Sequence, residues 1–145
     1  MLDRDITSAN ASVAMFSEFF NNVVPFVQFG ADNAWSQDNY EFLEHRMGVD
    51  GHVAIGFTPV EKTITFTFEA NSPTLDSLNI LYKAMEVDKK PYYSNIVITI
   101  PALRKKFYLR YAYLTSYKVI PDGDKTLSPV EATFTFESVD EETFA

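Results

Sequence analysis

Two segments of the chain alternate strictly between apolar and polar side chains. Lys62-Thr-Ile-Thr-Phe-Thr-Phe-Glu-Ala70 has an apolar residue at every second position, and Glu131-Ala-Thr-Phe-Thr-Phe-Glu137 repeats the pattern. A period of two is typical of a β-strand with one buried face. We therefore expect two similar strands in one sheet, side by side. Their core-facing residues are Ile64, Phe66, Phe68, Ala70, Ala132, Phe134 and Phe136.

The period changes to about 3.6 between Asn71 and Lys89, which predicts one amphipathic helix over about 73–87. Ser72 is a candidate N-cap with Pro73 at the first helical position, and Asp88-Lys-Lys-Pro91 ends the helix with positive charge followed by a proline. The apolar face has Leu75, Leu78, Leu81, Tyr82 and Met85.

Four further segments read as strands: Val23–Phe29, Tyr40–Arg46, Ser94–Ile100 and Lys105–Ile120. Pro25 places the first of them at a sheet edge or a bulge. Glycines 48, 51 and 56 indicate a loop or irregular hairpin after the second. The last has apolar residues at both parities, which favours a strand covered on both sides, in part by a neighbouring subunit.

These elements predict a mainly β fold, a sandwich or barrel of about seven strands with one packed helix. No linker or repeat divides residues 1–145, so we expect a single domain. The composition agrees, because 13 Phe, 8 Tyr and 1 Trp in 145 residues favour strands.

Few side chains in the sequence could perform chemistry. There is no Cys, and the two His lie near Glu41, Glu44 and Asp50, in a cluster that resembles an H-x-x-E-H zinc motif without its first His. That motif needs a helix, whereas this segment reads as strand and loop. No nucleophile, P-loop or dinucleotide motif is present. We therefore predict no metal, no cofactor and no enzyme. No apolar run is long enough for a signal peptide or a membrane span.

Charge is banded along the chain, whose net charge is −8. Residues 1–76 have 3 bases and 11 acids, residues 77–118 have 8 bases and 2 acids, and residues 119–145 have 1 base and 7 acids. Bands of opposite sign allow copies of one protein to attract each other through different faces. Such a chain is expected to self-assemble.

Bases and aromatics interleave in Arg104-Lys-Lys-Phe-Tyr-Leu-Arg-Tyr-Ala-Tyr113. On a strand, this pattern could bind single-stranded nucleic acid by stacking and phosphate contacts. The acidic net charge argues against it, since such binders are usually basic. An isolated β-sandwich that binds single strands through this surface remains the alternative hypothesis.

The order of the elements resembles the tail tube proteins of contractile-tailed bacteriophages over about residues 20–140. The residues that support the resemblance are Met47-Gly-Val-Asp-Gly-His, Asn-Ser-Pro-Thr74 at the start of the helix, Ser-Asn-Ile-Val-Ile-Thr-Ile100 and Thr-Phe-Thr-Phe-Glu137. The resemblance implies a non-enzymatic virion protein whose hexameric rings stack into a rigid tube, assembled in the bacterial host cytoplasm. DNA would pass through the lumen without specific binding. Type VI secretion and other contractile injection systems have related tubes, and the sequence leaves that alternative open.

The resemblance also implies partners and surfaces. Sheath, baseplate and tail-terminator proteins would bind the tube. Residues 1–22, which match nothing in the family, would form an N-terminal arm, and residues 31–60 an extended loop or hairpin for subunit contacts. The predicted lumen-lining residues are Thr63, Thr65, Thr67, Glu69, Thr133, Thr135 and Glu137. The predicted subunit-contact residues are Asp32, Asp38, Glu44, Arg46, Asp50, Lys89, Lys90, Arg104 and Lys105.

Overall fold

The computed structural model describes residues 11–17, 20, 23–27 and 34–144, in which ten strands, one α-helix and one 3-10 turn are found. The elements are β1 (Ser12–Ser17), β2 (Val24–Phe26), β3 (Trp35–Ser36), β4 (Leu43–Met47), β5 (Val53–Phe57), β6 (Lys62–Phe68), α1 (Thr74–Asp88), β7 (Ser94–Ile100), the turn Pro101–Leu103, β8 (Lys105–Tyr117), β9 (Val130–Phe136) and β10 (Ser138–Thr143). The predicted fold class, mainly β with one helix, is confirmed.

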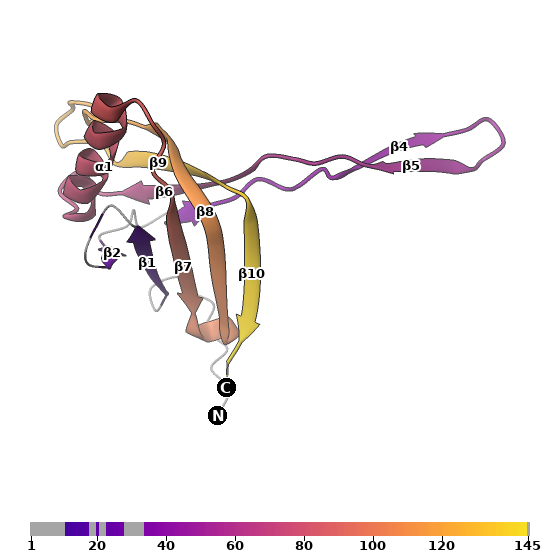
Figure 1. Cartoon of the computed structure of the whole chain (residues 1–145), viewed down its shortest axis with the longest axis horizontal. Coiled ribbons are helices and arrows are strands. Elements are labelled where there is room, and N and C mark those ends of the chain that lie inside the picture. Colours follow the sequence, from indigo (N-terminus) through magenta and orange to yellow (C-terminus); the bar gives the residue numbers. More distant parts are fainter. Residues whose placement is uncertain (1–10, 18–19, 21–22, 28–33, 145) are drawn as a thin grey trace.

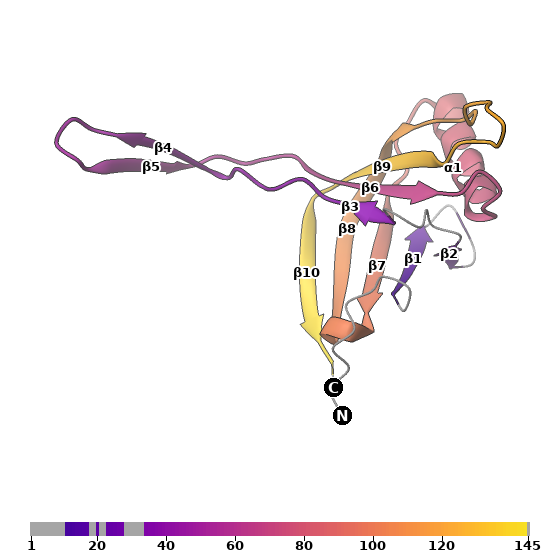
Figure 2. The same ribbon diagram turned by 180° about the vertical axis from the view of Figure 1, so that it is seen from behind.

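Eight of the strands form a bent antiparallel sheet that folds over itself as a sandwich, and β4 and β5 form a separate two-stranded sheet. The order of the larger sheet is β2-β1-β7-β8-β9-β6-β3, and β10 pairs with β8. Figures 1 and 2 show β6 and β9 running across the direction of β7, β8 and β10, with α1 beside one end of the body. The first half of β8 pairs with β7, and its second half pairs with β9. One long strand therefore joins the two layers.

A β-bulge lies where β8 passes from one layer to the other. Ser94 pairs with Ala112 and Ile96 with Leu109, so Asn95 faces two residues of β8. Tyr111, one of these two, has a φ of 53°, and its N–H donates to Asn95 Oδ1 at 3.2 Å. A bulge increases twist and bends a strand. The bend gives β8 its two sets of neighbours.

Phenylalanines fill the space between the layers. Phe66, Phe68 and Phe134 are completely buried, and the ring of Phe26 on β2 lies 5.0, 5.3 and 6.1 Å from their respective centroids. The predicted pairing is also confirmed, because Phe66 is opposite Ala132 and Ile64 opposite Phe134 in the β6–β9 ladder. Of the predicted core face, only Ala70 is half-buried instead of buried.

Helix α1 covers this core with the predicted face, since Leu75, Leu78 and Leu81 are buried. The predicted cap is wrong in detail. Pro73 occupies the cap position, and Ser72 Oγ accepts the Thr74 N–H at 3.3 Å while donating to Val27 O at 2.5 Å. The serine is thus bound to β2 as well as to the helix. Lys89, with a φ of 52°, ends the helix in the left-handed conformation.

Four strands lie outside the six predicted strand segments, namely β1, β3, β5 and β10, and β5 belongs to the predicted loop or hairpin. β1 lies between β2 and β7 and buries Val13 and Met15. Ser12–Ser17, which fall within the predicted N-terminal arm of residues 1–22, therefore belong to the sheet. Residues 1–10 lie outside the described residues. The two-residue strand β3 pairs with β6, and β10 continues the line of β9 along β8. The predicted edge position of Pro25 is confirmed, because β2 pairs with β1 alone among the described strands.

We predict that Phe66→Ala lowers the free energy of unfolding by about 3–5 kcal/mol, because a ring-sized cavity remains in a core that cannot collapse. Urea denaturation followed by circular dichroism measures the change. Phe16→Ala is the control, since Phe16 is 44% exposed on β1 and its truncation leaves no buried cavity. Wild-type stability in Phe66→Ala would contradict the assignment of the core face.

Candidate assembly surfaces

The β4–β5 hairpin is the most exposed element of the described chain. Every residue of both strands is exposed, and both views show the hairpin standing clear of the sandwich (Figures 1 and 2). Ser36 to Met47 is eleven residue steps, so an extended chain reaches about 36 Å. β3 and β6 hold the base of this arm in the sheet, and Trp35 packs against the core.

The hairpin has one apolar face and one mixed face. In its ladder Leu43 is opposite Phe57, His45 opposite Ile55, and Met47 opposite Val53. Side chains directly opposite each other point to the same face of a sheet, so five large apolar side chains and one imidazole share a face. Ile55 is 63% exposed and Phe57 74%. Exposed apolar patches of this kind mark interaction sites.

The turn of the hairpin explains the glycine motif of the sequence. The N–H of Gly48 donates to His52 O at 2.8 Å, and the N–H of Gly51 donates to Gly48 O at 3.0 Å. Asp50 Oδ1 accepts the N–H of His52 at 3.1 Å. Gly51 has a φ of 85°, and a Cβ on Gly48 would lie 2.7 Å from Asp50 Oδ1. Asp50 and both glycines thus close a tight turn.

A second surface is the polar face of β6 and β9, here called the threonine face (Thr63, Thr65, Thr67, Thr133 and Thr135). Thr63 is opposite Thr135 and Thr65 opposite Thr133. The Thr65 and Thr133 hydroxyls are 3.0 Å apart, and Thr115 on β8 extends the surface with its hydroxyl 2.9 Å from that of Thr135. All five threonines are half-buried. Thr67 Oγ1 is buried and hydrogen-bonds to no described residue, and Glu131 is opposite Thr67 on the same face. The result is a surface of threonine hydroxyls with one exposed carboxylate at its edge.

The two predicted glutamates lie at opposite ends of this surface. Glu69 follows the end of β6, and Glu137 follows the end of β9, and these two strands are antiparallel. Seven residue pairs of the β6–β9 ladder lie between Glu69 and Glu137. Lys62 Nζ donates to Glu137 O at 3.2 Å. The structure therefore brings the five threonines together but separates the two carboxylates.

The predicted subunit-contact residues do not form one cluster. Glu44 and Arg46 lie on the mixed face of the hairpin beside Gly56 and Ala54. Asp38 is exposed in the arm, Lys89 and Lys90 are exposed at the end of α1, and Arg104 is exposed beside β8. Asp32 lies outside the described residues. A contact role for these residues stays a prediction.

The basic band and the C-terminal acidic band meet within one chain. Lys105 Nζ is 2.7 Å from Glu141 Oε1, and Arg110 Nε is 2.5 Å from Asp140 Oδ2. The pairing with β10 thus satisfies within one subunit an attraction that the charge pattern of the sequence predicts between subunits. The hydrogen bond with Asp140 raises the pKa of Arg110, and the hydrogen bond with Glu142 raises the pKa of the Tyr108 hydroxyl. These pairs are exposed, so each adds little to stability.

The same pairing weakens the nucleic-acid hypothesis for residues 104–113. Leu109 and Ala112 are buried in the core, and carboxylates of β10 already bind Lys105 and Arg110. The Lys106 ammonium lies 5.7 Å from the Phe144 ring centroid. Phosphates would have to compete with fixed carboxylates of the same chain at this surface.

The described residues include no cluster of metal-ligating side chains and no membrane-spanning helix. No group of three His, Cys, Asp or Glu side chains among them could hold an ion, and His45, Asp50 and His52 are exposed along the hairpin. In the part of the chain that the structure describes, no helix is long and apolar enough to cross a membrane.

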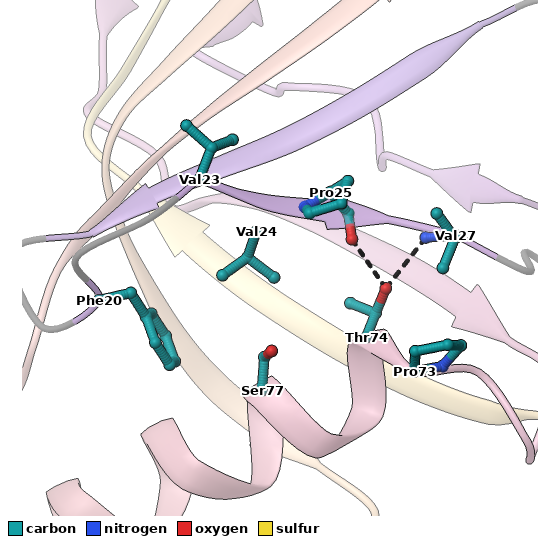
Figure 3. A pocket seen from close by; sticks show the side chains of 8 residues that line it. All are labelled: Phe20, Val23, Val24, Pro25, Val27, Pro73, Thr74 and Ser77. Atoms are coloured by element: carbon teal, nitrogen blue, oxygen red, sulfur yellow. Dashed lines mark hydrogen bonds between the residues drawn. The ribbon is translucent and has the colours of Figure 1, made fainter.

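A third surface is an apolar groove between β2 and the start of α1 (Figure 3). Thr74 joins the two elements, because its Oγ1 donates to Pro25 O at 2.9 Å and accepts the Val27 N–H at 3.0 Å. The groove has a volume of about 450 Å³, and none of the described residues that line it is charged. Its lining residues are Phe20, Val23, Val24, Pro25, Val27, Pro73, Thr74 and Ser77.

A β-sandwich with one covering helix is the class of structure that this chain shares with components of contractile injection systems. A chain of the cryo-EM structure of the PVC sheath/tube terminator in its extended state is 14% identical with a TM-score of 0.71, covering 99% of this chain and 100% of that one. A chain of the PVC sheath-tube complex in its extended state is 15% identical with a TM-score of 0.67, covering 99% and 95%. A chain of the anti-feeding prophage tube-terminating cap is 13% identical with a TM-score of 0.60, covering 97% and 92%. At these identities the likeness concerns the fold.

A family model described as tail fiber protein gp32 matches residues 4–140, and the chain belongs to this family. A search of curated proteins finds no significant match. The predicted relationship to phage tails and contractile injection systems is therefore confirmed.

We predict that the hairpin of the free subunit exchanges its amide hydrogens rapidly, because an isolated two-stranded hairpin is marginally stable in water. Hydrogen exchange followed by mass spectrometry compares peptides from residues 43–57 with peptides from β6 and β9. Assembly that covers the apolar face should slow exchange in the hairpin and leave exchange in β6 and β9 unchanged. Equal protection in free and assembled protein would contradict a role of this face in assembly.

Proposed function

We propose that the protein is the structural subunit of an inner tail tube, assembled as stacked hexameric rings. The observation on which this rests most is the hairpin, a long arm whose apolar face is exposed in the described subunit. Burial of each large apolar side chain contributes about 1.5–3 kcal/mol, so covering this face favours association of subunits. The contact role that we proposed for residues 31–60 would belong to this arm.

Several solved structures with the same fold support a tube. The chain shares its fold over nearly its full length with chains from a sheath-tube complex and a tube terminator, and a chain of the six-fold symmetrised anti-feeding prophage baseplate has a TM-score of 0.59. Six-fold rings are therefore the assembly we propose. Sheath, baseplate and terminator proteins are the proposed partners. A phage tail and an extracellular injection device are both compatible with this proposal, and the family description favours the phage.

We further propose that the threonine face lines the lumen. Its hydroxyls present no cation to phosphate, and DNA binding depends on cations that replace condensed counterions. With Glu69 and Glu137 at its ends, such a wall would repel DNA weakly and let it slide. This assignment would explain why a strongly acidic protein serves as a conduit for DNA.

We predict that Phe57→Asp abolishes assembly while the subunit stays folded, because it places a carboxylate on the apolar face of the arm. Negative-stain electron microscopy and sedimentation measure assembly, and circular dichroism measures folding. Ile120→Asp is the matched control, since Ile120 is 77% exposed in the loop before β9 and Phe57 is 74% exposed. Tubes formed by Phe57→Asp would contradict the role of the arm, and a wild-type protein that stays monomeric would contradict the tube.

We predict that Thr63→Lys tubes retain DNA at low salt, because six cations per ring would face the lumen and each phosphate contact releases counterions. The measurement is the amount of DNA that stays nuclease-resistant in purified tubes. Thr99→Lys is the control, because Thr99 is a half-buried threonine on β7, in the other layer. Nuclease resistance in the control and not in Thr63→Lys would assign the lumen to the other layer.

A further inference from the structure

We infer that the apolar face of the β4–β5 hairpin in one subunit docks into the groove between β2 and α1 of another copy of the chain. The inference rests on the proposed function and specifies which surface of the neighbour receives the arm.

The arm and the groove lie at opposite ends of the molecule. Figures 1 and 2 show β2 and α1 at one end of the longest axis and the hairpin at the other. A subunit cannot fill its own groove with its own arm in this geometry. A contact between two different surfaces of identical subunits is head-to-tail, and head-to-tail contacts produce closed rings or open filaments.

The groove suits side chains better than an added strand. Pro25 lacks an N–H, and the Pro25 and Val27 carbonyls and the Val27 N–H already bind Ser72 and Thr74. Strand addition needs free backbone groups at a sheet edge. At these positions of β2 the edge is closed, so the recognition would come from apolar side chains entering the groove.

Charge favours the same pair of surfaces. The net charge of −8 makes two copies repel each other wherever carboxylates face carboxylates. None of the described residues that line the groove is charged, and the apolar face of the hairpin has His45 as its one titratable group. Two acidic subunits can meet there without placing carboxylates in contact.

Cysteine cross-linking tests the docking, because the chain has no Cys of its own that could form another disulfide. We would combine Ile55→Cys on the arm with Ser77→Cys in the groove, assemble the protein and oxidise it mildly. A disulfide needs Cα atoms less than about 7 Å apart. A ladder of covalent oligomers on non-reducing gels is expected from this pair. The pair Ile55→Cys with Val23→Cys is expected to give the same ladder, since Val23 is an exposed position of the groove. This second pair keeps the test valid if Ser77→Cys disturbs folding.

Two controls define the outcomes. Ile55→Cys with Val87→Cys should give no ladder, since Val87 is 76% exposed but lies about 15 Å from Ser77 along the helix. Ile55→Cys alone should give no dimer. Dimers of the single variant would show hairpin pairing with hairpin and overturn the inference. If both groove pairs form intact tubes but give no ladder, the docking site is wrong and the proposed tube is unaffected. Absence of any wild-type assembly would overturn both.

Discussion

The contact of Phe26 with the phenylalanines of β6 and β9 is the interaction on which the rest of the structure depends. Phe26 lies on the edge strand β2, while Phe66, Phe68 and Phe134 lie in the other layer. Because successive side chains of a strand alternate, burying these rings fixes the register of β6 against β9. That register places the threonines on the opposite face. It also holds β2 against the start of α1, where the groove lies.

The parts of the fold that were predictable from the sequence are those with a strong local period. β6, β9 and α1 bury residues at regular spacing, and each was located almost to its ends. β1 and β10 have no such signal. β10 buries almost nothing and exists because it pairs with β8, a partner about 30 residues away in the chain. The pairing of a short acidic strand depends on long-range contacts that a single sequence does not specify.

The candidate surfaces were predictable to different degrees for the same reason. The threonine face followed directly from the alternation of β6 and β9. The arm was anticipated only as a loop or hairpin, because an apolar run such as Val53-Ala-Ile-Gly-Phe57 does not tell whether its face is buried in the core. The exposure of every residue of β5 depends on the tertiary structure, which the local sequence does not specify. The groove could not be anticipated, since it arises where Thr74 and Ser72 bind the backbone of β2.

Pairing of the charge bands within the chain changes what holds subunits together. If Lys105 and Arg110 were free, acidic neighbours would be drawn to them and assembly would depend steeply on salt. The ion pairs with β10 neutralise these two cations in the subunit itself. Attraction between copies would then depend less on these two cations and more on apolar burial, which salt does not screen. An assembly held in this way would keep its contacts across a wide range of ionic strength, and its acidic surfaces would be left to repel DNA.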